Sequence, residues 1–125
     1  MKLSRIIDGR FHMALARLSA QPVPLKIAFK LKGIVAKVNE EMKKYEEVRS
    51  AALQKLGTKG EDGKLVVNEQ NNVQMSEEAM KQFATELNEL GSTDIELPTV
   101  TLAELGDKTN LTAEDAMSLD GVIVE

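Results

Sequence analysis

The stretch from Pro24 to Leu56, PLKIAFKLKGIVAKVNEEMKKYEEVRSAALQKL, decides the fold of this chain. Its apolar residues recur at steps of three and four, which places them along one face of a helix, while Lys and Glu occupy most other positions. Pro24 suits the first turn of a helix, and Gly57 suits the residue after its end. The predicted apolar face consists of Ala28, Leu31, Val35, Val38, Met42, Tyr45, Ala52 and Leu56.

This helix requires a partner. It spans about 48 Å at 1.5 Å per residue, which is more than a chain of 125 residues can cover from end to end. Ser76 predicts the start of a second helix, because a serine side chain accepts a hydrogen bond from the first free N–H groups. Gly91 ends that helix, so we expect an antiparallel helical hairpin over residues 22–91. The apolar face of the second helix consists of Met80, Phe83, Leu87 and Leu90.

The segment between the two helices predicts a small β-hairpin at residues 58–75, at the tip of the helical hairpin. Residues 60–63 (GEDG) are typical of a turn, and residues 64–67 (KLVV) are a short β-prone run. Residues 73–75 can pair back onto that run. Asp62 could be the first ligand of a calcium loop, but the other ligand positions lack the required residues, so we expect no calcium site.

The flanking segments are shorter and less regular. Residues 1–21 predict an N-terminal helical segment interrupted at Gly9, either as one weakened helix or as a short strand that leads into a helix from Phe11. Residues 94–102 alternate around Pro98, which favours an edge strand or an extended arm. Thr112 predicts the start of a short helix over 113–119. The apolar stub at residues 122–124 is expected to dock on some surface, of this chain or of a partner.

Together these patterns predict one domain over residues 1–125, mainly α with minor β. It is a long antiparallel helical hairpin with a small β-hairpin at its tip and an extended C-terminal arm ending in a short helix. The predicted parts are the N-terminal helical segment at 1–21, the helical hairpin at 22–91 with its β tip at 58–75, and the arm and short helix at 92–125.

Composition disfavours most catalytic chemistry. The chain has no Cys and one His, so thiolate metal sites, thiol catalysis and most zinc and triad chemistry are excluded. His12 is expected to lie at the solvent edge or to pack within the fold, and no glycine-rich phosphate loop is present. No apolar run approaches the length needed to span a membrane or to act as a secretory signal. We expect no enzyme activity, no catalytic, cofactor or metal residues, and no membrane partner.

Charge is divided between the two halves of the chain. Residues 1–57 hold 12 Lys and Arg against 5 Asp and Glu, and residues 58–125 hold 4 against 15. We expect the halves to pack on each other or on neighbouring copies, and we disfavour nucleic acid, because the acidic half would repel phosphates. The best candidates for contact with a protein partner are the basic stripe and the apolar C-terminal stub, namely Arg17, Lys26, Lys30, Lys37, Val122 and Ile123.

Several stretches together resemble a family of small tailed-bacteriophage proteins, a domain of unknown function. They are residues 24–31 (PLKIAFKL), 40–57 (EEMKKYEEVRSAALQKLG), 61–67, 83–90, 95–98 and 111–119. The resemblance implies a phage origin and synthesis in the bacterial cytoplasm, and it brings no catalytic or binding residues.

Two functions are open at this point. The first is a non-enzymatic virion-associated or assembly factor that acts by protein–protein contacts, with itself as a homo-oligomer or with a phage structural protein. The alternative is an early phage inhibitor that binds a host enzyme or defence complex.

Overall fold

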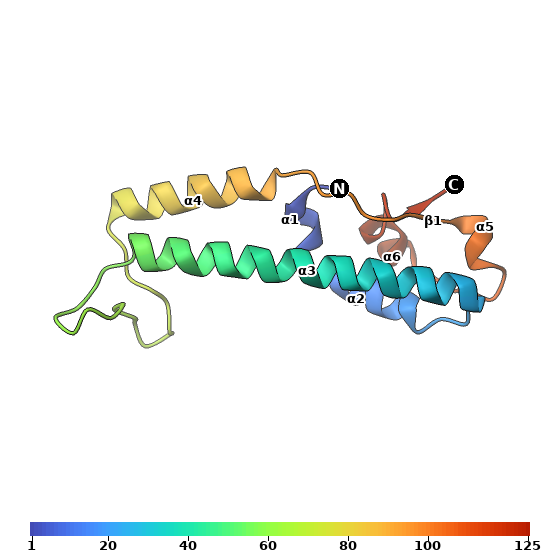
Figure 1. Ribbon diagram of the computed structural model, residues 1–125, viewed down its shortest axis with the longest axis horizontal. Coiled ribbons are helices and arrows are strands. Elements are labelled where there is room, and N and C mark those ends of the chain that lie inside the picture. Colours follow the sequence, from blue (N-terminus) through green and yellow to red (C-terminus); the bar gives the residue numbers. More distant parts are fainter.

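The computed structural model describes all residues from 1 to 125 and is mainly helical with a small two-stranded sheet. The molecule is elongated, with one long helix running along most of its length (Figure 1). In chain order the elements are α1 Leu3–Ile6, α2 Gly9–Ser19, α3 Leu25–Leu56, α4 Glu77–Gly91, β1 Val100–Thr101, α5 Leu102–Leu105, α6 Ala113–Ser118 and β2 Ile123–Val124.

Helix α3 is continuous over 32 residues and is followed by Gly57, as the sequence predicts. Its buried row overlaps the predicted face but does not match it. Leu31 and Val38 are buried as predicted, and Val35, Met42 and Tyr45 are half-buried against the core. Ile27 and Ile34 lie in the core, whereas Ala28 is exposed. Both pairs of neighbours, 27–28 and 34–35, are apolar, so the spacing alone allowed two rows one residue apart. The row that packs on the core is Ile27, Leu31, Ile34, Val38 and Glu41.

Helix α4 runs back alongside the C-terminal half of α3 (Figure 1). Ser76 caps it as predicted, accepting a hydrogen bond from the backbone N–H of Ala79 at 3.2 Å. The contact between the two helices is thin. No residue of α3 after Glu41 is buried, and within α4 only Gly91 is buried.

The predicted β-hairpin at 58–75 is wrong as a pair of strands. The tip holds only isolated antiparallel bridges, between Lys59 and Leu65 and between Val67 and Val73. Its apolar side chains are at most half-buried, because no other element covers this end of the molecule. A two-stranded hairpin needs such a covering element to be stable, so regular strands do not form here.

The regular strands lie elsewhere and are parallel. Strand β1 pairs with β2, with Val100 opposite Ile123. The extended arm therefore accepts the C-terminal stub as its partner. Val100 and Val122 are fully buried, and the backbone N–H of Val100 donates to the carbonyl of Val122 at 2.8 Å.

The core lies at one end of the molecule. It is a single cluster of 14 buried residues from α1, α2, the N-terminal half of α3 and the C-terminal arm. The interruption near Gly9 separates two helices, because Asp8 caps α2 through the backbone N–H of Arg10 at 2.9 Å. The alternative of a strand before Phe11 is wrong, since residues 3–6 are helical. Helix α6 begins after Thr112 as predicted, with the Thr112 side chain accepting from Asp115 N–H.

Candidate protein interface

Arg17, a predicted partner-binding residue, is committed to an ion pair inside the molecule. Its Nε donates to Oδ2 of Asp115 at 2.9 Å, and a terminal guanidinium nitrogen donates to Oδ1. The Asp115 side chain is only 4% exposed, while that of Arg17 is 48% exposed. The Arg17 guanidinium holds the pKa of Asp115 below its usual value. Arg17 therefore fastens α2 to α6.

Two lysines of the predicted basic stripe are also paired. Lys30 Nζ lies 3.2 Å from Oε2 of Glu104, and Lys37 Nζ lies 2.9 Å from Oε1 of Glu41. The hydrogen bond from Lys37 lowers the pKa of Glu41. Lys26 is exposed and makes no ion pair. The four predicted cations thus do not form one free basic surface.

The predicted C-terminal contact residues lie in or beside the core. Val122 is fully buried, and Ile123 is half-buried in β2. Their apolar surface is used by β1 and the core within this chain. The stub docks on its own protein.

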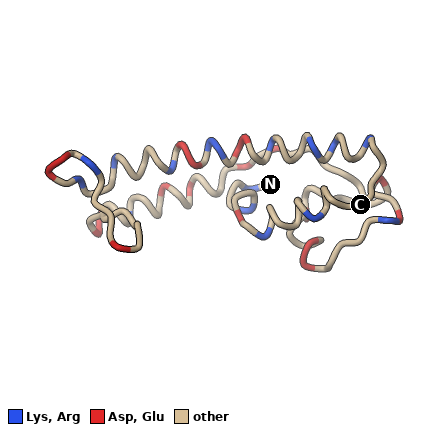
Figure 2. Tube along the Cα trace, turned by 90° about the horizontal axis from the view of Figure 1, so that it is seen from below, with Lys and Arg blue, Asp and Glu red and all other residues tan.

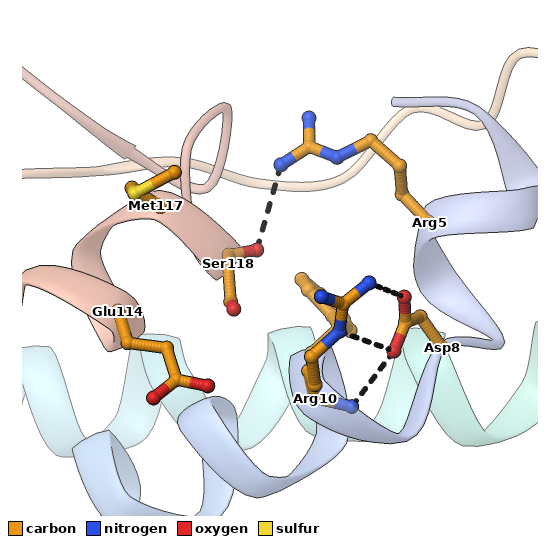
Figure 3. A pocket seen from close by; sticks show the side chains of 7 residues that line it. Arg5, Asp8, Arg10, Glu114, Met117 and Ser118 are labelled. Atoms are coloured by element: carbon orange, nitrogen blue, oxygen red, sulfur yellow. Dashed lines mark hydrogen bonds and ion pairs between the residues drawn. The ribbon is translucent and has the colours of Figure 1, made fainter.

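A pocket lies where α1 and the start of α2 face α6, with a volume of about 270 Å³ (Figure 3). The guanidinium groups of Arg5 and Arg10 line this pocket, and both already bind acceptors within the chain. Arg5 donates to the carbonyl of Ser118 at 3.4 Å, and Arg10 forms an ion pair with Asp8 at 3.0 Å. The hydrogen bond from Arg10 lowers the pKa of Asp8. Arg5 thus links α1 to the end of α6, and Arg10 is held against the residue that caps α2.

The single histidine is half-buried and packs against a neighbouring ring. The His12 ring meets Phe11 edge-on, with 6.0 Å between ring centroids, and its Nε2 is buried without a hydrogen-bond partner.

No cluster of three or more His, Asp or Glu side chains is placed to hold a metal ion. None of the helices combines the length and apolar character that crossing a membrane requires.

Among the large apolar side chains, the two with the highest exposed fractions lie on the side of α3 that faces away from the core. Leu25 is 89% exposed and Phe29 is 82% exposed. At about 100° per residue, they lie on the side opposite the buried row. The sequence contained this signal, because the two residues are four apart and off the predicted face. We call this surface the outer face of α3; it consists of Leu25, Ala28, Phe29, Gly33 and Ala36, all exposed.

A second apolar surface lies at the other end of α3. It is a groove between α3 and α4 with a volume of about 370 Å³, and most of its lining residues are hydrophobic. We call it the α3–α4 groove; its apolar lining is Val48, Ala52, Phe83, Leu87 and Leu90.

Comparisons with protein-family models, with curated proteins and with solved structures found no match.

Proposed function

We propose that this protein acts by protein–protein contacts as a non-enzymatic assembly or virion-associated factor of a tailed bacteriophage. The observation that carries the proposal is the outer face of α3. Leu25 and Phe29 are almost wholly exposed on neighbouring turns of one helix. Single exposed apolar residues are normal, but large neighbouring ones mark a surface that a partner covers.

The polar groups support a protein partner more than nucleic acid. Phosphate binding needs free cations, yet Arg17, Lys30 and Lys37 form ion pairs within the chain. In contrast, the outer face has no internal partner. An apolar surface beside a few free lysines suits a protein that has both apolar and acidic side chains.

The phage assignment rests on the resemblance of residues 24–31, 40–57 and 61–67 to the tailed-phage family. An elongated molecule with a long helix and a small core at one end fits an assembly role, since much of its surface is free for neighbours. On this proposal the protein is made in the bacterial cytoplasm and acts during assembly or is carried in the virion.

Two experiments test this function. The first is mass spectrometry of purified virions, which we expect to contain the protein. The second is affinity capture from infected cells with wild-type protein and with Phe29→Glu, which should lose the partner, either a phage structural protein or untagged copies of this chain. Met117→Glu is the matched control, because Met117 is 76% exposed on α6, away from the outer face.

The outcomes separate the two candidate functions. Recovery of one host enzyme or defence protein, together with absence from virions, would identify the protein as a host-directed inhibitor. Absence from virions together with no captured partner would overturn the proposal.

A further inference from the structure

We propose that the outer face of α3 docks into the α3–α4 groove of a second copy of this chain, so that copies join head to tail. The inference rests on the proposed function and names its partner. Both surfaces are apolar, and both are open in the single chain. Phe29 supplies a large ring on one, and the groove of about 370 Å³ has room for an aromatic side chain on the other.

The charges around the two surfaces are opposite. Lys26 and Lys32 flank the outer face, and no Asp or Glu occurs between residues 9 and 39. Glu86 and Glu89 line the groove, where Arg49 is the only cation. None of these five groups forms an ion pair within the chain. Docking would therefore place free lysines beside free carboxylates, which favours this pairing over contact between two outer faces.

Figure 2 shows this arrangement along the molecule, with Lys and Arg on the N-terminal part of α3 and Asp and Glu on α4. Two outer faces brought together would instead set Lys26 and Lys32 of one copy against the same residues of the other. Like charges at an interface are repulsive, so the outer face has a poor partner in itself.

The two surfaces cannot meet within one copy. Phe29 and Ala52 lie 23 positions apart on the same continuous helix. That separation is about 35 Å along the helix axis and roughly 140° around it. A twofold dimer would need both surfaces to face the same side, which this rotation prevents. Each copy can instead offer its outer face to one neighbour and its groove to another, which gives a chain or a closed ring.

The test uses two variants that each disable one surface. Phe29→Glu puts a carboxylate opposite the acidic groove, and Val48→Glu puts one inside the apolar groove. Both sites are well exposed, at 82% and 52%, so the fold should be retained, which circular dichroism checks. In analytical ultracentrifugation, the wild-type assembly should exceed the mass of a dimer, either rising steadily with concentration as an open chain or reaching a fixed ring of three or more copies. Each variant alone should associate roughly 30-fold more weakly.

Mixing the variants distinguishes a head-to-tail contact from a twofold one. The mixture contains one good groove, on Phe29→Glu, and one good outer face, on Val48→Glu. An equimolar mixture should therefore form a one-to-one dimer and stop there. Met117→Glu, the control, should assemble as wild type does. Addition of salt should weaken the wild-type assembly, because it screens the lysine–glutamate contacts.

Three results would overturn the inference: a wild-type monomer at every concentration, a wild-type assembly that ends at two copies, or a mixture that stays monomeric. These results leave the proposed function intact if the protein is found in virions or captures a phage structural protein. Conversely, head-to-tail assembly without either finding supports the docking and removes the phage role.

Discussion

Arg17 and Asp115 lie 98 positions apart in the sequence, and their bidentate ion pair joins α2 to α6. The carboxylate is almost completely buried, and the guanidinium is half exposed. The pair holds α6 against α2. Because Val122 and β2 follow α6 directly, it also helps to keep the end of the chain on the core. It also carries a basic residue of the first half onto an acidic residue of the second, as the charge division predicts.

Asp115→Asn should lower the stability of the protein at neutral pH by several degrees in Tm. The pKa of Asp115 is lowered in the folded state, so the pair stabilises the fold above the unfolded carboxyl pKa of about 3.9. This stabilisation is lost as pH falls through the lower folded value. The gap between wild type and variant should therefore be constant above about pH 5 and close below about pH 4. Urea unfolding across this pH range measures it.

Asp8→Asn is the matched control for this prediction. Asp8 also pairs with an arginine, but its side chain is 37% exposed, and Asn caps a helix as well as Asp does. Its effect should be small at every pH. An equally large, pH-dependent loss in Asp8→Asn would show that burial of Asp115 has no special role.

Glu41→Leu should stabilise the protein by about 1 kcal/mol. Glu41 is 7% exposed and continues the buried row of α3, so a Leu there packs on the core without a carboxylate to desolvate. Lys37 and Lys44 lose their partner, but both are exposed enough to be hydrated. Thermal unfolding compares it with Glu40→Leu, whose side chain is 58% exposed and should give no gain. A destabilised Glu41→Leu would contradict this interpretation of the row.

Gly57→Ala should destabilise the protein by about 1–3 kcal/mol, because overpacking forces neighbours apart. A Cβ at Gly57 would lie 2.6 Å from Leu65 Cδ2 and 2.7 Å from the carbonyl oxygen of Leu53. Gly33→Ala is the matched control. Nothing lies within 4 Å of a Cβ there, so this change should stabilise α3 by about 1 kcal/mol. Chemical unfolding at low protein concentration measures both, and equal effects would show that the tip does not pack on Gly57.

Leu31→Ala and Leu25→Ala should separate the two sides of α3. Leu31 is 2% exposed, so its truncation should cost about 3 kcal/mol through lost burial and a cavity. Leu25 is 89% exposed, and its truncation should change the free energy of unfolding by less than about 0.5 kcal/mol. Urea unfolding distinguishes them. Similar losses would place the core on the wrong side of the helix.

The helices could be predicted from the sequence because their signals are local. Pro24 and Gly57 bracket α3, and Ser76 and Thr112 cap α4 and α6. For the row of α3 that faces the core, the sequence predicts Leu31 and Val38 but not Ile27, because Ile27 and Ala28 fit the same spacing. What decides between them is where α2 and the arm pack, and that information is not local.

Long-range pairing explains most of what the sequence did not show. The parallel contact of Val100 with Ile123 and the ion pair of Arg17 with Asp115 depend on segments brought together by the whole fold. For the same reason Val122, predicted at a partner surface, lies in the core. The outer face of α3 is visible in the sequence only as a second apolar pair, Leu25 and Phe29, off the predicted face; that this pair is the exposed one depends on where the other elements pack.

The uneven burial along α3 means that the molecule does not open everywhere with the same ease. The end that carries α4 and the tip has no fully buried side chain from α3 after Glu41, so its amides should exchange with deuterium long before those of the core end. A ligand that fills the space beside α4 would slow this exchange without touching the core. The N-terminal half of α3 is thus held in place by the core, whereas its C-terminal half can open locally. The second half can therefore adjust to a bound partner while the first keeps its structure.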